Sequence, residues 1–262
     1  MDFTRVLVVS NFIHPFYENV GFIRDLYEFP NIRFYGDDGW PVAGGVIPYN
    51  QSDRRSLKSK AGSGGMFAYR CMLEAVRDWP EFSGYLFLMD DVLISRRKFR
   101  SMDERTAYLS LPGRRCDIEG GGPSDDWHWW KSEFGIEACR RAYARLPGRF
   151  KSALARRVGG ARVFVGQAND CFYLPRRLVP DFVEVFSTMS DARVFTEIAI
   201  PTGFAMIEPN LNEVGICYLW NRRRWLWPLY GLSPMYSGIH PVKFSGAMAR
   251  RYASMLKMAS LV

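Results

Sequence analysis

The chain has 262 residues, a net charge of +8 and an apolar share of 48%, which suits one large folded domain and excludes a disordered chain. No stretch reaches the roughly 18 unbroken apolar residues of a membrane span, and the N-terminal residues lack the basic and apolar regions of a signal peptide. We therefore expect a cytoplasmic protein without a transmembrane segment. Aromatic residues make up 15% of the chain and can rest against a membrane interface, so peripheral membrane contact is a further possibility.

The basic residues occur mostly as scattered pairs, and no aromatic-basic RNA-binding signature accompanies them. We expect solvated faces and no nucleic-acid partner, with a minority of the pairs attracting an anionic donor or an acidic surface. The cysteines show neither metal-ligand nor redox-motif spacing, which indicates free thiols in a reducing compartment and no structural zinc. They are Cys71, Cys116, Cys139, Cys171 and Cys217.

The first elements of the chain predict a parallel α/β sheet. The apolar run Arg5–Asn11 is typical of a buried strand, and Tyr17–Glu28 has helical spacing of apolar residues. Asn31–Tyr35 is predicted as a second strand. A strand, a helix and a strand in this order indicate a β-α-β unit.

The next segment contains the strand that we assign most firmly. Residues 36–64 are rich in Gly, Pro, Asp and Ser and are predicted to form a long loop. Gly65–Trp79 follows as a helix that ends at Pro80. Gly84–Met89 is then an uncharged strand that runs directly into Asp90 and Asp91.

Residues 101–160 have a different character, with a Gly-rich loop, a tryptophan cluster and two short basic helices. We interpret them as an insertion over the site, so that residues 1–262 form a single domain. The elements expected downstream are strand character at 161–174, a helix at 178–189, apolar runs at 198–201 and 214–218, and an amphipathic helix at 246–261.

The Asp90-Asp91 pair is the main functional signal. In open α/β sheets, ligands bind beyond the carboxyl ends of the strands. Two adjacent carboxylates would repel each other there unless a cation or strong donors compensate. A hard divalent ion with oxygen ligands would do so, and it could also hold the phosphates of a nucleotide diphosphate. The alternative is a strand-end turn in which one Asp caps the next segment.

Four segments resemble a known family. Gly84–Ile94 resembles the Asp-x-Asp strand end of GT-A-fold glycosyltransferases and, more narrowly, of exostosin-related proteins of algae and their large viruses, including a chlorovirus xylosyltransferase. Asn11–Asn19, Phe195–Pro201 and His240–Ser245 resemble further segments of such proteins, in the same order. The resemblance implies a GT-A (Rossmann-like) mixed sheet flanked by helices. It also implies sugar transfer, with xylose as a family-level expectation.

The resemblance also implies roles for individual residues. Position 89 is Met where many relatives carry a first acid, so metal contact is expected from Asp91, and Asp90 is expected to meet the ribose or sugar hydroxyls. A late histidine can complete the metal shell in such enzymes, which points to His240, and Lys243 could meet a phosphate. The alternative for His240 is a partly exposed side chain in a turn fixed by Pro241.

Three other residues are candidates for donor binding. Asn11 ends the first strand, where a GT-A fold commonly meets the base and ribose; the alternative is that it caps the next helix. Tyr35 could stack on uracil or be a half-buried strand residue, and Arg70 could face the diphosphate or be an exposed helix residue. We expect His14 to order the loop after the first strand and His128 to belong to the tryptophan cluster.

Two acids compete for the acceptor side. Glu197 lies among apolar residues, where an unpaired carboxylate is costly; its pKa would rise and suit a general base. It could instead be a buried carboxylate paired with an arginine or capping a helix. Asp170 follows a predicted strand and could bind acceptor hydroxyls or occupy a turn. Trp127, Trp129 and Trp130 could form a sugar platform or a small satellite core.

The sequence therefore predicts transfer of a sugar from a UDP-sugar donor to a glycan hydroxyl with Mn²⁺ or Mg²⁺ as cofactor. With Glu197 as base, a single displacement would invert the anomeric carbon; a retaining outcome stays open. One alternative is a nucleotidyltransferase that forms a sugar nucleotide, although Asn11–Pro15 lacks the glycines of a phosphate loop. Another is a non-catalytic basic binding module.

Overall fold

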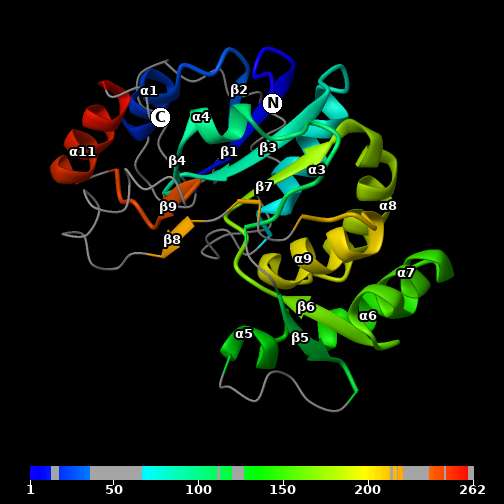
Figure 1. Ribbon diagram of the computed structural model, residues 1–262. Coiled ribbons are helices and arrows are strands. Elements are labelled where there is room, and N and C mark those ends of the chain that lie inside the picture. Colours follow the sequence, from blue (N-terminus) through cyan, green and yellow to red (C-terminus); the bar gives the residue numbers. More distant parts are fainter. Residues whose placement is uncertain are drawn as a thin grey trace.

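The computed structural model of the chain has a mixed α/β architecture in which helices flank a four-stranded sheet (Figure 1). This confirms the predicted fold class, while the narrower GT-A assignment stays a prediction. His14, Cys217 and the loop expected at 36–64 lie outside the described residues. The structure describes residues 1–12, 18–35, 67–110, 113–119, 127–212, 215–216, 218–220, 236–244 and 246–258.

The central sheet consists of β1 (Val6–Asn11), β2 (Ile32–Tyr35), β3 (Gly84–Met89) and β7 (Cys171–Pro175). Its order is β2-β1-β3-β7, with the first three strands parallel and β7 antiparallel to β3. β1 and β3 are buried at every position, because helices cover both faces of the sheet. That burial explains their unbroken apolar sequences, and the three strands predicted from the first 90 residues are confirmed.

Five longer helices pack around this sheet: α1 (Glu18–Tyr27), α3 (Tyr69–Asp78), α8 (Val179–Asp191), α9 (Thr196–Ile207) and α11 (Ala247–Met258). α1 and α11 lie side by side, whereas α3 packs against α8 and α9 (Figure 1). The helices predicted at 17–28, 65–79, 178–189 and 246–261 correspond to α1, α3, α8 and α11. The apolar run at 198–201 belongs to α9, whose side chains are buried almost throughout, so this helix has no amphipathic pattern.

The strand order reverses at the carboxyl end of β1. β1 lies between β2 and β3. The chain therefore adds β2 on one side of β1 and later adds β3 on the other side. Because such parallel connections are right-handed, α1 and α3 are placed on opposite faces of the sheet. The point where the strand order reverses is where ligands enter open α/β sheets. Here that point is the end of β1 and β3.

A second, small sheet lies beside this end. It contains β4 (Leu93–Ile94), β9 (Gly238–His240) and β8 (Tyr218–Trp220), with β9 in the centre, antiparallel to β4 and parallel to β8. β4 begins only two residues after Asp91 and continues into α4 (Arg96–Arg100). The pairing of β4 with β9 therefore brings a segment about 145 residues later in the chain to the end of β3.

The region predicted as an insertion contains a two-stranded ladder and helices. Its helices are α5 (His128–Lys131), α6 (Ile136–Arg145) and α7 (Gly148–Val158), and its strand β5 (Arg114–Asp117) pairs with β6 (Val163–Gly166). α6 packs on α8, and α7 packs on α9 and β6. A short 3-10 helix, Arg176–Leu178, leads from β7 into α8.

Two expectations about composition can be compared with the structure. Cys71, Cys116, Cys139 and Cys171 are buried free thiols, as expected, and burial raises the pKa of the Cys116 thiol to about 12. Within the described residues, no helix has the length and apolar character to cross a bilayer.

Aromatic rings from the sheet and from α8 and α9 pack together in the core. Phe87 of β3 stacks on Phe172 of β7 with ring centroids 4.7 Å apart, and Phe172 meets Phe204 edge-on at 5.5 Å. Phe182 and Phe186 of α8 stack at 4.1 Å and contact Phe204 from the other side. These contacts join β3 to the helices behind it, and so fix the strand that carries Asp90 and Asp91.

We expect Phe172→Ala to lower the free energy of unfolding by about 3–5 kcal/mol, because Phe172 is fully buried and contacts two other rings. Urea denaturation measures this loss. Val183→Ala is the control, since this α8 side chain is 39% exposed, and it should cost less than about 1 kcal/mol. Equal losses in the two variants would contradict the packing described for β3 and β7.

Candidate functional site

Asp90 and Asp91 follow β3 directly and are buried, each 3% exposed. The Asp90 N–H donates to the carbonyl of Asn11 at 3.0 Å, and the Val92 N–H donates to the carbonyl of Met89 at 3.2 Å. The chain therefore turns tightly at the carboxyl end of the sheet, and the turn is attached to the end of β1. Burial of two neighbouring carboxylates requires compensating partners.

Asn11 connects the end of β1 to its surroundings through its side chain. Its Oδ1 accepts a hydrogen bond from the Cys71 thiol at 3.3 Å, and its Nδ2 donates to Met89 Sδ at 3.4 Å. Asn11 is 2% exposed. Asn11 ends β1, as predicted, and its side chain is directed toward α3 and β3. Its role in donor binding stays a prediction.

Asp170 reaches the same place because β7 is antiparallel to β3. The residue that enters β7 must then lie beside the residue that leaves β3. The Met89 N–H donates to the Asp170 carbonyl at 2.9 Å, which continues the ladder by one bond. Asp170 and Asp91, 79 positions apart in the chain, are thus brought to one edge of the sheet.

The pairing of β4 with β9 brings His240 and Lys243 to Asp91. The Val242 N–H donates to the Asp91 carbonyl at 2.6 Å. His240 Nε2 lies 3.1 Å from Asp91 Oδ1, and the Lys243 ammonium donates to Asp91 Oδ2 at 2.6 Å. The other imidazole nitrogen, Nδ1, lies 3.5 Å from Asp170 Oδ2. His240 therefore lies between two carboxylates, and each Asp91 oxygen faces a basic group.

The charges of this cluster are strongly coupled. Burial opposes ionisation of Asp91, but the hydrogen bond and charge of His240 and the charge of Lys243 outweigh it and lower the pKa of Asp91 to about 2. Burial likewise disfavours the imidazolium of His240, yet its bond to Asp91 and the charges of Asp170 and Asp91 raise its pKa. Burial raises the pKa of Asp170. At neutral pH, Asp91 is a carboxylate held between basic groups.

Glu197 enters the site from the first turn of α9, where a carboxylate is favoured by the helix dipole. Pro201, four residues later, has no N–H to bond the Glu197 carbonyl within the helix. That carbonyl instead accepts a hydrogen bond from the Gln167 N–H at 2.7 Å. Gln167 lies three residues before Asp170. Because the proline leaves the Glu197 carbonyl free to accept the Gln167 N–H, this hydrogen bond connects the start of α9 to the segment that carries Asp170.

The environment of Glu197 suits proton transfer at neutral pH. Burial, followed by the negative charge of Asp170, raises the pKa of Glu197 to about 7, while His240 and Arg114 act in the opposite direction. A carboxylate with such a pKa can accept a proton from a bound hydroxyl near pH 7. The raised pKa that we expected from the apolar sequence around Glu197 is therefore found, and a charged neighbour contributes to it.

The tryptophan cluster borders this part of the site. Trp129 stacks on Phe195 with ring centroids 4.5 Å apart, and Trp127 meets Phe195 edge-on at 6.4 Å. The Trp127 ring also covers Gly166, where an added Cβ would lie 2.6 Å from the ring. These rings pack against the main hydrophobic core at the start of α9, so they do not form the separate satellite core that was one of the two predicted alternatives. Binding of a sugar to the half-buried Trp127 remains untested.

Within the described part of the chain, the contacts of the other two predicted donor residues, Arg70 and Tyr35, do not include Asp91, although Tyr35 pairs in register with Asn11 at the carboxyl edge of the sheet. Arg70 donates through Nε to Ser190 Oγ at 2.8 Å and through a terminal nitrogen to the Ser190 carbonyl at 3.0 Å, so it fastens α3 to α8. Tyr35 is fully buried at the end of β2, and its carbonyl accepts from the Phe12 N–H at 2.7 Å. Neither contact involves Asp91 or its partners.

A divalent cation at Asp91 would have to replace the proton that Asp91 Oδ1 and His240 Nε2 share, because a histidine that binds a metal must be neutral. Asp91 Oδ1 and His240 Nε2, 3.1 Å apart, have about the spacing of neighbouring ligands of an octahedral ion, roughly 3 Å for bonds of about 2.1 Å. Within the described part of the chain, no group of three or more His, Cys, Asp or Glu side chains is arranged to hold a metal. Mg²⁺ is commonly held by one or two carboxylates together with substrate phosphates and water, and of these Asp91 supplies one carboxylate.

The structure adds residues that the sequence did not reveal. Arg114 of β5 influences the charge on Glu197, because the pairing of β5 with β6 places it opposite Gly166. Thr196 is buried beside Glu197, and its Oγ1 has no hydrogen-bond partner among the described residues. Pro201, inside an apolar run, was the one sequence signal that could have pointed to the altered first turn of α9.

Comparisons with known proteins do not establish a family. No family model and no curated protein matches the chain. Among solved structures, the chain is similar to a glycosyltransferase involved in the glycosylation of the major capsid of PBCV-1. The alignment covers 97% of this chain and 98% of that chain, at 8% sequence identity and a TM-score of 0.41. A likeness of this size leaves the function to be argued from the site itself.

The raised pKa of Glu197 predicts how stability depends on pH. Because the folded state binds this proton more tightly than the unfolded chain does, the contribution is present below pH 4.5 and lost as the pH rises through 7. Glu197→Gln should therefore raise the free energy of unfolding at pH 8 by on the order of 2–3 kcal/mol and change it little at pH 4.5.

Urea denaturation at the two pH values measures this difference. Glu133→Gln is the matched control, because Glu133 is an exposed acid in the same half of the chain, and its effect should be small at both pH values. A Glu197→Gln variant that is less stable than the wild type at pH 8 would contradict the buried, weakly compensated carboxylate.

Proposed function

We propose that this protein is a glycosyltransferase that moves a sugar from a UDP-sugar to a hydroxyl group of a glycan. The observation that supports this most is the joining of two different carboxylates at the sheet's carboxyl edge. Asp91 is held fully ionised by His240 and Lys243, while Glu197 has a pKa of about 7. One acid suits a fixed negative ligand, and the other suits a proton acceptor.

On the donor side, Asp91 and His240 would hold Mn²⁺ or Mg²⁺, an ion that offsets negative charge on a leaving diphosphate. Lys243 is 39% exposed at its side chain, so its ammonium is available to a phosphate as well as to Asp91. Asp90 lies in the turn that follows β3, and its N–H donates to the carbonyl of Asn11 at the end of β1. This is the edge where the ribose and base are expected in an open α/β sheet.

On the acceptor side, Glu197 would remove the proton from the attacking hydroxyl, and Asp170 would orient that hydroxyl or its neighbours. The acceptor oxygen then forms a bond to the anomeric carbon as the bond to the diphosphate breaks, which inverts the configuration at that carbon. The buried start of α9 limits water around Glu197, which favours transfer to the acceptor over hydrolysis. Xylose is the sugar that the sequence resemblance favours.

We expect Asp91→Asn to abolish Mn²⁺-dependent UDP binding, because the variant loses the charge that the cation and Lys243 both require. Isothermal titration calorimetry with UDP, with and without Mn²⁺, measures this. Asp25→Asn, an exposed acid on α1, is the control and should bind like the wild type. If Asp91→Asn bound UDP in the presence of Mn²⁺ as tightly as the wild type, Asp91 would not be a metal ligand.

We expect Glu197→Gln to spare UDP binding but to slow transfer by on the order of a hundredfold or more, because a neutral amide cannot accept the proton. Wild-type transfer should rise with pH to a plateau with an apparent pKa near 7, since only ionised Glu197 acts as base. The variant should lose this pH dependence.

Product analysis separates this proposal from its alternatives. A nucleotidyltransferase would consume a nucleoside triphosphate and not a UDP-sugar, and a non-catalytic binding module would consume neither. A normal rate and pH profile in Glu197→Gln would require another residue as base.

A further inference from the structure

Most of the net charge of the molecule is concentrated in one segment. Residues 136–162, here called the basic arm, comprise α6, α7 and the turn that leads to β6. The basic arm contains eight Lys or Arg residues and a single acid, Glu137, whereas the whole chain has a net charge of only +8. The remaining charged residues therefore nearly balance one another. A concentrated positive field of this kind attracts anionic partners.

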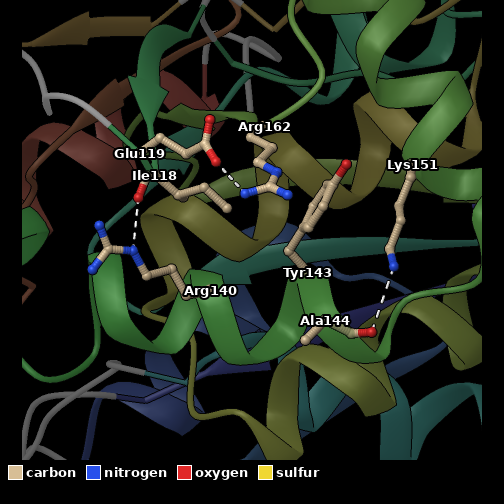
Figure 2. Close-up of a pocket in the computed structure, with 7 residues that line it drawn as sticks. All are labelled: Ile118, Glu119, Arg140, Tyr143, Ala144, Lys151 and Arg162. Atoms are coloured by element: carbon tan, nitrogen blue, oxygen red, sulfur yellow. Dashed lines mark hydrogen bonds and ion pairs between the residues drawn. The ribbon is translucent and has the colours of Figure 1, made fainter.

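The basic arm borders a pocket of about 560 Å³, which lies between α6, α7 and one end of the β5–β6 ladder (Figure 2). Three of its lining residues are cations, Arg140, Lys151 and Arg162, one is an acid, Glu119, and Tyr143 lies among them. The volume is within the range of pockets for small ligands. Cations that surround a concave site give a discrete binding position, in contrast to a charged flat surface.

The three cations differ in how far they are already compensated. Arg162 pairs with Glu119. Arg140 donates to the Ile118 carbonyl at 2.7 Å and pairs with Glu137 at 2.6 Å. Lys151, in contrast, has no carboxylate partner among the described residues. Its ammonium is 3.5 Å from the Ala144 carbonyl and 5.0 Å from the centre of the Tyr143 ring.

The surroundings of Tyr143 indicate what kind of anion fits. Figure 2 shows its ring between the side chains of Lys151 and Arg162, whose charged groups lie 5.0 Å and 5.8 Å from the ring centre. Stacking of a nucleic-acid base would require a free ring face. Among the described residues, the large apolar side chains that are exposed lie on α8 and α11, so the basic arm has none to insert into a membrane. A compact anionic group, such as a carboxylate, fits these contacts.

The β5–β6 ladder links this pocket to the candidate functional site. At one end of the ladder Arg114 pairs with Gly166, next to Gln167 and its bond to Glu197. At the other end Asp117 pairs with Val163, next to Arg162 of the pocket. Four paired residues span roughly 10 Å. A chain of a few sugars following the ladder would thus reach both places.

We infer that the pocket beside Lys151 binds a carboxylate group of an acidic glycan, so that the acceptor of this enzyme is an anionic oligosaccharide. This inference rests on the proposed function, since it identifies the acceptor of that reaction. In this arrangement the Lys151 ammonium contacts the carboxylate, Arg162 and Arg140 add to the positive field, and the reacting hydroxyl lies at Glu197.

Direct binding tests the inference without any sugar transfer. The probe is an oligogalacturonate, and its dissociation constant is measured by calorimetry at fixed salt, with no donor present. Lys151→Met should weaken binding about tenfold or more, the effect of losing a charge-assisted hydrogen bond. Arg145→Met is the matched control: it removes the same charge from an exposed position of the basic arm outside the pocket, and should weaken binding less than about threefold.

A neutral maltooligosaccharide of equal length should bind much more weakly than the oligogalacturonate. If Lys151→Met and Arg145→Met weakened oligogalacturonate binding equally, the result would contradict a specific site at the pocket and indicate diffuse electrostatic attraction. The inference that the ligand is an anionic glycan would be contradicted if the wild type failed to bind the oligogalacturonate. It would also be contradicted if single-stranded DNA of the same charge bound equally tightly. If transfer from UDP-sugar fails while these binding results hold, only the proposed function is contradicted.

Discussion

The ionised carboxylate of Asp91 is the group on which the rest of the site depends. It is buried at the end of β3, and such a charge is tolerated only because His240 and Lys243 face its two oxygens. Those partners belong to the segment that begins with β9, so the site exists only while β9 is paired with β4. The sheet of β4, β9 and β8 is therefore required for the site, because it positions the basic groups that compensate the charge of Asp91.

The same cluster extends to the second acid through His240 and Asp170. Each member changes the proton affinity of the next: Asp170 raises the pKa of His240 and Glu197, and His240 opposes the rise at Glu197. Neighbouring groups with widely separated pKa values are typical of sites that need both a permanent charge and a proton acceptor. A cation or phosphate that alters the charge around Asp91 would therefore also change the proton affinity of Glu197, because Asp170 and His240 interact with both acids.

Much of this was predictable from local patterns. The uncharged run Gly84–Met89 and its acidic end identify both the strand and the centre of the site, since a strand's carboxyl end is where open sheets bind ligands. The helical assignment of Thr196–Ile207 was less accessible, because a helix buried on all sides has no polar face. The contact of Arg70 with Ser190 could not be predicted for another reason. Ser190 lies on α8, 120 residues away, and only tertiary packing brings the two residues together. Long-range pairing, such as Arg114 with Gly166, has no local signal at all.

The distance along the chain between Asp91 and its partners has a consequence for biosynthesis. His240 and Lys243 follow Asp91 by 149 and 152 positions, so a ribosome has to synthesise more than half of the polypeptide between them. In the interval, the nascent chain can form the contacts of β1, β2 and β3, which are closer in sequence, while the acid at the end of β3 stays solvated. The fold can thus begin to assemble long before the basic partners of Asp91 are synthesised, and completion of the cluster coincides with docking of the last segments.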